Sequence, residues 1–256
     1  MSIAKSVDAY LVGLYLPDED QSTRYKLLHR WDKGALLPAM SQIEKTLQGE
    51  NKILFDKQLS VMEVPGTWRV VRSFSDIERQ GRLVDLVIFG QPDPDEERPS
   101  FSSQFAQRLI LSLGVPVLLS PFNGESLKLG REAMVAWDGS SEASRAMHDA
   151  IPLLLLCENV TVVTVRELYN SDPRSLCTPD RAVSALLRHG LKNVSGSVAA
   201  IEDLDTGTIL WSRMADRHFD FLVMGAYANS RIRERIVGGV TQTLIQEATV
   251  PVLFSH

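Results

Sequence analysis

The sequence lacks most features that mark extracellular, membrane or nucleic-acid-binding proteins. Its 256 residues include only two cysteines, Cys157 and Cys177, too few for a disulfide framework or a zinc site. The net charge is −5, and neither half has the basic excess that binding to a phosphate backbone requires. The apolar runs at residues 9–16 and 151–157 are far shorter than the roughly 20 residues that cross a bilayer. We therefore expect a cytoplasmic protein without nucleic-acid or membrane partners.

The sequence also lacks the common short motifs of catalysis. There is no GxxxxGK[ST] loop, no GxSxG elbow, no HExxH pair and no GxGxxG after a strand. The five histidines are scattered along the chain, so no metal site is predicted. We assign no catalytic residue, and the sequence favours binding over turnover.

What the chain does contain is an internal repeat at one constant offset, the one that aligns Gln107 with Gln242. At this repeat offset, residues 107–120 (QRLILSLGVPVLLS) align with residues 242–255 (QTLIQEATVPVLFS). Residues 85–90 (DLVIFG) align in the same way with residues 220–225 (DFLVMG). Two blocks in one register indicate a tandem duplication. We predict a first domain at residues 1–122 and a second, complete domain at residues 123–256.

The second repeat alternates apolar runs with segments of helical spacing. Continuous apolar runs separated by helices predict a parallel sheet that is covered on both faces. The predicted fold class is α/β, with two tandem doubly wound parallel five-stranded sheets, the first of which lacks its first strand and helix. In the second repeat the first strand starts at Ala133 and the second at Val160, whereas the run at 9–16 lies almost at the start of the chain.

Two strand ends of the second repeat carry residues suited to ligand binding. Asp138 follows the first strand and Gly225 ends the fourth. In open parallel sheets, ligands lie at the carboxyl ends of the strands where the strand order reverses. A carboxylate in this place can accept hydrogen bonds from ribose hydroxyls. Alternatively, Asp138 caps the following helix or closes a turn with Gly139.

A glycine pair, Gly238 and Gly239, precedes the last predicted helix, whose inward positions begin at Val240. A helix start has unpaired N–H groups and a partial positive charge, and glycine lets an anion approach the backbone. Ser230 and Thr241 add hydroxyl groups. The alternative is a tight turn that glycine permits, with no bound ligand.

These residues resemble the universal stress protein family in its tandem form. The matching segments are residues 135–150 (VAWDGSSEASRAMHDA), 205–210 (DTGTIL) and 221–255. The resemblance implies an adenine nucleotide α-hydrolase-like fold with strand order 3-2-1-4-5. It also implies an adenine nucleotide, ATP, as partner, with Mg²⁺ only when ATP is bound. By resemblance Asp138 takes the ribose, Val163 and Val165 flank the adenine, and residues 225–230 and 238–241 hold the triphosphate.

Members of the family that bind ATP carry the motif G-x2-G-x9-G-(S/T). Its four positions fall here on Gly225, Ala228, Gly238 and Gly239, so the second and the fourth depart from the motif. If the second position needs a positive φ, alanine costs about 1–2 kcal/mol there. The lost hydroxyl contact costs about another 1 kcal/mol. We expect ATP binding that is weakened roughly ten- to a hundredfold, not abolished.

The first repeat should not bind ATP in the family manner. The loop after Gly90 is acidic and contains prolines, and no glycine pair opens the helix that follows it. The family strand order places strand one in the centre of the sheet, so its absence leaves a gap. We expect Met1 to lie downstream of the ancestral start, and either strands two and four to pair directly or a partner to fill the gap.

The sequence thus predicts a stress-response protein that binds ATP weakly in its second repeat and acts in signalling or regulation. The resemblance implies that the repeats pack as a pseudo-dimer through their last strands, VPVLLS and VPVLFS, and self-association or a protein partner is a further expectation. The alternatives are a nucleotide-independent interaction module, which Ala228 and Gly239 favour, and a slow nucleotide hydrolase, which only the fold analogy supports.

Overall fold

The computed structural model describes residues 2–17, 33–91, 103–122, 130–167, 177–201, 206–226, 245 and 248–256. The chain separates into two compact units, Met1–Gln80 and Gly81–His256. Within the described residues, no helix is both long enough and apolar enough to cross a membrane.

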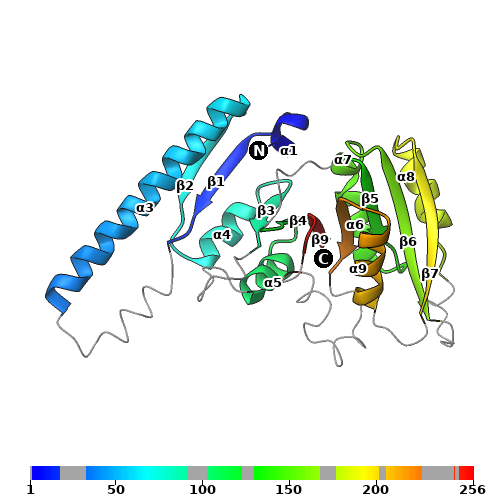
Figure 1. The fold of residues 1–256 in the computed structure, drawn as a ribbon. Helices are drawn as coiled ribbons and strands as arrows, with labels where there is room; N and C mark the ends of the chain where they lie inside the picture. Colours follow the sequence, from blue (N-terminus) through cyan, green and yellow to red (C-terminus); the bar gives the residue numbers. More distant parts are fainter. Residues whose placement is uncertain are drawn as a thin grey trace. The chain divides into compact units, whose positions relative to one another are not determined.

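The first unit is built around a pair of parallel strands (Figure 1). It contains α1 (Ser2–Ser6), β1 (Leu11–Tyr15), the long helix α3 (Lys33–Met62), β2 (Gly66–Val70) and most of α4 (Phe74–Gly81). The Trp68 ring of β2 packs against Phe55 of α3, with 5.4 Å between ring centroids. A side chain at Gly13 of β1 would place its Cβ 2.8 Å from both rings. Glycine there lets α3 pack closely on the strands.

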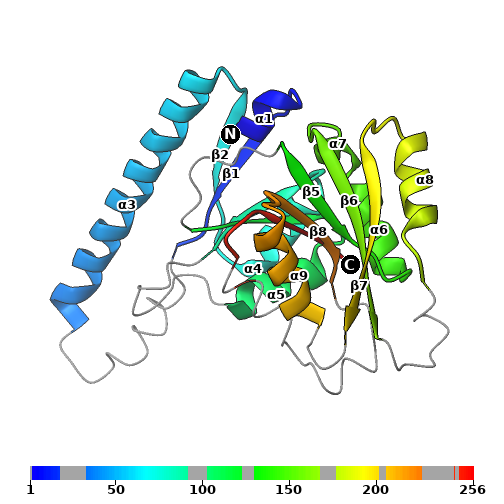
Figure 2. The ribbon, with the colours of Figure 1, turned by 45° about the vertical axis from the view of Figure 1, so that its right-hand side comes forward.

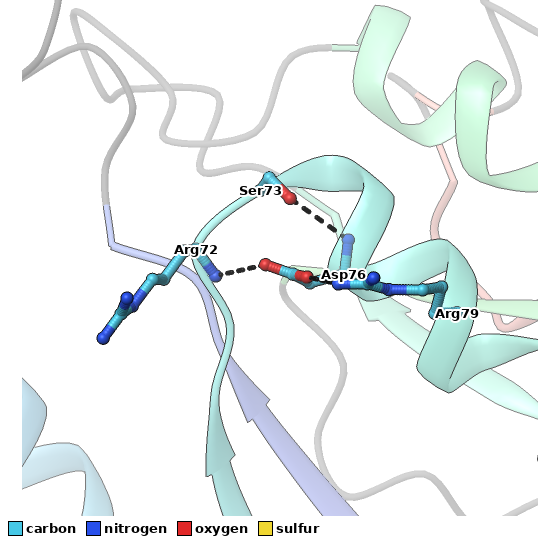
Figure 3. A network of polar contacts seen from close by, with 4 residues as sticks. All are labelled: Arg72, Ser73, Asp76 and Arg79. Atoms are coloured by element: carbon cyan, nitrogen blue, oxygen red, sulfur yellow. Dashed lines mark hydrogen bonds and ion pairs between the residues drawn. The ribbon is translucent and has the colours of Figure 1, made fainter.

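Helix α4 begins with a capping network, drawn in Figure 3. The Ser73 hydroxyl accepts a hydrogen bond from the Asp76 N–H at 3.2 Å. The Asp76 carboxylate in turn accepts from the Arg72 N–H at 3.0 Å and pairs with Arg79. This reciprocal arrangement is a variant of the capping box, which satisfies N–H groups that a helix start leaves unpaired. The backbone hydrogen bond from Arg72, followed by those of Arg79 and Ser73, lowers the pKa of Asp76.

The second unit contains one seven-stranded sheet in the order β3-β4-β9-β8-β5-β6-β7. Its strands are β3 (Val87–Gly90), β4 (Val117–Ser120), β5 (Glu132–Ala136), β6 (Asn159–Glu167), β7 (Val194–Ile201), β8 (Phe221–Gly225) and β9 (Val252–Ser255). Its helices are α5 (Ser103–Ser112), α6 (Ser141–Asp149), α7 (Ile151–Leu154), α8 (Asp180–Arg188) and α9 (Thr206–Asp216). Figure 2 shows α9 on one side of the sheet and α6 and α8 on the other, as right-handed crossovers require.

The second repeat has the predicted strand order, because β7-β6-β5-β8-β9 reads 3-2-1-4-5 within that repeat. Each neighbouring pair among these five strands is parallel. The centre of the sheet is fully buried at Met134, Leu222 and Phe254. The α/β class predicted from the sequence is confirmed.

The two repeats also share their strand register. Val87 pairs with Val117 in the first repeat, and Leu222 pairs with Val252 in the second, which is the same pairing displaced by the repeat offset. The predicted contact between the last strands is confirmed as well. β4 and β9 pair antiparallel, with Leu118 opposite Leu253, and this pairing joins the repeats into one sheet.

The first repeat does not form a single sheet of its own. Its four strands fall into two pairs, β1 with β2 and β3 with β4, and no described residues pair β1 with β3. The expectation that strands two and four pair directly is therefore wrong. The equivalent strands of the second repeat, β6 and β8, do not pair with each other either, because β5 lies between them.

The compact units consequently divide at Gln80, inside the first repeat, and not at the predicted domain boundary between residues 122 and 123. The reason is that β3 and β4 extend the sheet of the second repeat through the β4–β9 pairing. The boundary at residues 122 and 123 remains a prediction about where one repeat ends and the next begins in the sequence.

Candidate functional site

The strand order of the second repeat reverses between β5 and β8. From β5 the chain continues to β6 and β7 on one side, whereas β8 and β9 lie on the other. The carboxyl ends of β5 and β8 lie side by side, because Val135 pairs with Val223 in a parallel register. Asp138 follows β5 directly, and Gly225 is the last residue of β8. The structure thus brings these two predicted residues to the position where open parallel sheets bind ligands.

Asp138 is exposed and takes part in the turn that leads into α6. Its Oδ1 accepts hydrogen bonds from the Ser140 N–H at 2.9 Å and from the Ser140 hydroxyl at 2.5 Å. Ser140 is the N-cap of α6, and its Oγ accepts from the Ala143 N–H at 3.1 Å. Gly139 lies in this turn with φ of +78°, which only glycine adopts at little cost. Asp138 therefore has the alternative role considered from the sequence, which is to close the turn with Gly139 that leads into α6.

That local role uses one carboxylate oxygen of Asp138. The hydrogen bonds from Ser140 both end on Oδ1, and within the described part of the chain no hydrogen bond reaches Oδ2. An ionised carboxylate can accept at both oxygens. Turn formation at Oδ1 and acceptance of a ligand hydroxyl at Oδ2 are thus compatible.

Gly225 is required by close packing beneath the start of α6. A Cβ at this position would lie 2.6 Å from the Ala143 nitrogen and 2.6 Å from the Glu142 carbonyl carbon. Both are backbone atoms, which cannot move aside as a flexible side chain can. The sequence singled out Gly225 as a ligand contact, and the structure adds this packing role.

The residues predicted to flank adenine lie on β6, next to β5. Val163 is buried, and its carbonyl accepts a hydrogen bond from the Trp137 N–H at 2.9 Å. Val165 is half-buried, two residues closer to the carboxyl end of the strand. Asp138, Val163, Val165 and Gly225 therefore come from three neighbouring strands of one sheet.

The remaining predicted site residues lie outside the described residues. They are Ala228, Ser230, Gly238, Gly239, Val240 and Thr241. Their assignment to a phosphate loop stays a prediction. Most of the acidic loop that follows Gly90 in the first repeat also lies outside the described residues.

Two residues near Asp138, Cys177 and Arg166, were not predicted from the sequence. A Cβ at Gly139 would lie 3.1 Å from the Cys177 Sγ, so this thiol is adjacent to the Asp138 turn. Arg166, near the carboxyl end of β6, donates from Nη2 to the Cys177 carbonyl at 3.3 Å. Its Nε is buried, and the described residues provide it with no hydrogen-bond partner. The only signal in the sequence was a charged residue directly after the apolar run at 160–165.

The surroundings of Cys177 favour its neutral thiol form over the thiolate. Partial burial, with the Asp138 carboxylate as a further contribution, raises the pKa of Cys177, although a hydrogen bond from Trp137 acts in the opposite direction. No group of three or more His, Cys, Asp or Glu side chains that could hold a metal ion occurs among the residues that the structure describes.

Comparison with known proteins agrees with this architecture. Residues 131–256 match the model of the Universal stress protein family. The second repeat therefore belongs to the universal stress protein family. Universal stress protein Slr1230 from Synechocystis is 27% identical over 149 residues, which cover 57% of this chain and 49% of that protein. The chain thus spans about half the length of this curated relative.

Solved structures extend the likeness in fold to nearly the whole chain. A universal stress protein from Archaeoglobus fulgidus is similar with a TM-score of 0.62 and 14% identity, over 96% of this chain and 85% of that chain. A functionally unknown protein from Pseudomonas aeruginosa PAO1 is similar with a TM-score of 0.52 and 12% identity, over 98% and 94% of the two chains. At these identities the likeness concerns the fold alone.

Proposed function

We propose that this universal stress protein binds ATP weakly in its second repeat and acts in the cytoplasm as a regulatory protein, not as an enzyme of high turnover. The observation that carries the proposal is the position of Asp138 and Gly225 at the carboxyl ends of two adjacent strands, where the strand order reverses. Asp138 retains an oxygen for a ribose hydroxyl after Ser140 has used the other.

Arg166 supports a polyanionic ligand at this edge of the sheet. Its guanidinium is partly buried near the carboxyl end of β6, and its Nε has hydrogen-bonding capacity to spare among the described residues. A buried donor without a partner is unfavourable, by about 1–3 kcal/mol, and a bound acceptor would remove that cost. A guanidinium also suits phosphate oxygens in charge and shape.

The phosphate contacts in this proposal come from Gly225 and from the predicted loop that includes Gly238 and Thr241. The replacements at Ala228 and Gly239 make the proposed affinity low. Magnesium would enter only with the nucleotide, because its ligands would be phosphate oxygens and water.

The test is ATP binding to the intact chain and to Asp138→Asn. Asparagine keeps an oxygen that can accept from Ser140, so the turn and the α6 cap should persist, whereas the second carboxylate oxygen is lost. We expect the Kd for Mg-ATP to rise about ten- to a hundredfold, since a hydrogen bond to a charged group contributes about 1.5–3 kcal/mol. The matched control is Glu158→Gln, which removes a carboxylate at the amino end of β6.

Equal affinities of Asp138→Asn and wild type, with unchanged thermal stability, would contradict the ribose role of Asp138. The nucleotide-independent alternative predicts no saturable ATP binding by either protein. Steady ATP turnover that disappears in Asp138→Asn would instead identify a hydrolase.

A further inference from the structure

β3 is an edge strand of the seven-stranded sheet, and the described residues pair it on one side only. Val87 and Gln91 donate their N–H groups to carbonyls of β4 and the residue before it, at 3.0 and 2.8 Å. Alternate residues of a parallel strand bond to the same neighbour, so the backbone groups of Ile88 and Gly90 face away from β4. Such an edge can pair with a further strand.

The second repeat shows what covers the same edge when the repeat is complete. Leu222 and Ala226 of the second repeat donate to the equivalent carbonyls at 3.0 and 2.8 Å, so β8 bonds to β9 as β3 bonds to β4. The other side of β8 is filled by β5, where Val223 pairs with Val135. Val223 is 0% exposed, whereas Ile88, its counterpart at the repeat offset, is 42% exposed.

In the second repeat, β5 continues into α6, which packs on β8. Among the described residues no equivalent helix packs on β3. The start of α6 lies so close to Gly225 that a Cβ would meet its backbone at 2.6 Å. At Gly90, the equivalent glycine, a Cβ would meet none of the described residues within 4 Å. Gly90 thus keeps the small size that a crossing helix needs, although among the described residues no helix crosses it.

A carboxylate that holds strand one in the second repeat also recurs in the first. Asp220 accepts hydrogen bonds from the N–H groups of Arg131 and Glu132, at 2.9 and 3.2 Å, just where β5 begins. Asp85 occupies the equivalent place before β3 and is exposed. The first repeat therefore retains the acceptor, the open strand edge and the glycine that strand one and its helix use in the second.

We propose that the free edge of β3 is a docking site for a strand–helix segment of a different protein. The segment pairs parallel to β3, presents apolar side chains as β5 does, and continues into a helix whose first turn has small residues. Asp85 binds the first N–H groups of the incoming strand, and the helix crosses above Gly90. Docking at β3 is independent of nucleotide binding, because β3 belongs to the first repeat and the proposed nucleotide site to the second.

A labelled peptide with the sequence of residues 130–150, which spans β5 and α6, is the probe. It is titrated into the intact chain, with a peptide of scrambled sequence as control. We expect saturable binding of the native sequence only. Ile88→Pro removes the outward N–H and should weaken binding at least about tenfold, and Asp85→Ala should also weaken it severalfold.

The matched control is Val198→Pro on β7, the other edge of the sheet. Val198 is 43% exposed, and the β6–β7 register also turns its N–H outward. We expect this variant to bind the peptide as wild type does. Equal loss with Val198→Pro and Ile88→Pro, or equal binding of the scrambled peptide, would overturn the proposal.

Hydrogen exchange of single amides tests the free edge directly. In the chain alone the amides of Ile88 and Gly90 should exchange much faster than those of Val87 and Gln91, and the peptide should protect them. Protection of Ile88 and Gly90 without peptide would overturn the proposal, because the edge would already be covered. A concentration-dependent dimer that Ile88→Pro abolishes would do the same and identify a second copy as the occupant.

Discussion

Equivalent residues in the two repeats have different environments, and the pair Gly90 and Gly225 shows this most clearly. A Cβ at Gly225 would meet backbone atoms at 2.6 Å, whereas a Cβ at Gly90 would meet no atom of the described part of the chain within 4 Å. Neither residue is among those with positive φ, so the effect of alanine depends on space alone. Alanine substitutions at Gly90 and Gly225 therefore report on side-chain packing and not on the backbone preference of glycine.

Gly225→Ala should lower the free energy of unfolding by about 1–3 kcal/mol, because α6 must move away from β8. Gly90→Ala should change it by less than about 0.5 kcal/mol, as expected for an open surface position. Urea denaturation of both variants measures the difference. Equal effects would contradict the close packing of α6 on Gly225.

The two cysteines, Cys157 and Cys177, also differ in how far they are buried. Burial, together with the nearby Asp220 carboxylate, raises the pKa of Cys157 to about 12. At pH 8 about one Cys157 thiol in ten thousand is then a reactive thiolate. Cys177 is less buried, although its pKa is also raised by partial burial.

Iodoacetamide at pH 8.5 should therefore modify Cys177 before Cys157, and mass spectrometry of tryptic peptides measures both rates. Because Cys177 lies beside Gly139, bound Mg-ATP should slow its modification, whereas Cys157 serves as an internal control. Faster modification of Cys157 would contradict its burial. An unchanged Cys177 rate at saturating ATP would place the nucleotide elsewhere.

At the scale of elements, the start of α4 depends on charge (Figure 3). The pKa of Asp76 is lowered by its hydrogen bonds to Arg72, Arg79 and Ser73. The folded-state pKa lies below the unfolded value of about 3.9, so the unfolded state binds more protons in this range. The contribution of Asp76 to stability is present above about pH 4 and disappears as the pH falls through the folded pKa.

Asp76→Asn should destabilise the protein at pH 7, and the difference from wild type should shrink at pH 3. Denaturant midpoints at the two pH values measure this change, with Glu78→Gln as a control that removes a charge from the same helix. A difference that is equal at both pH values would contradict the role of the ionised carboxylate. Ser73→Ala should cost about 1 kcal/mol through loss of the cap.

The pairing of β4 with β9 joins the repeats into one sheet, and it depends on buried aliphatic side chains. Leu118 and Leu253 face each other in the register, and both are 0% exposed. Leu118→Ala should therefore lower the free energy of unfolding by about 2–5 kcal/mol. The control Leu111→Ala removes a leucine that is 44% exposed and should cost far less. Similar costs for both variants would contradict this packing.

At the scale of the whole molecule, the repeat in the sequence predicted most of the strand pairing. The shared pattern of residues 85–90 and 220–225 specified two homologous strands, and their pairings indeed differ by the same repeat offset. The contact between β4 and β9 was expected from the resemblance to the family, whose repeats pack in this way. The strands themselves were predictable because a continuous apolar run encodes a buried strand locally.

Other features were not predictable from local patterns. Among the described residues β1 and β2 pair apart from β3 and β4, and the local pattern of a strand does not specify its neighbours. Cys177 and Arg166 approach the Asp138 turn from distant positions in the chain, so no short motif contains them. The second role of Gly225, under α6, likewise depends on contacts with residues that are far away in the sequence.

The two repeats thus have different proposed roles within one sheet. The second has a complete set of strands and the Asp138 turn at its switch point, which support a nucleotide site. In the first, the described residues pair β3 on one side only, which supports a docking site for another protein. Substitutions at the edge of β3 should leave ATP affinity unchanged, so the two proposals can fail separately.

Calorimetric titration of the intact chain with Mg-ATP tests the central claim most directly. We expect saturable heat at millimolar ATP, with one site per chain. We expect this heat to be lost in Gly238→Val, where a side chain would block the approach of phosphate to the backbone. Absence of heat at millimolar ATP in the wild-type chain would contradict it.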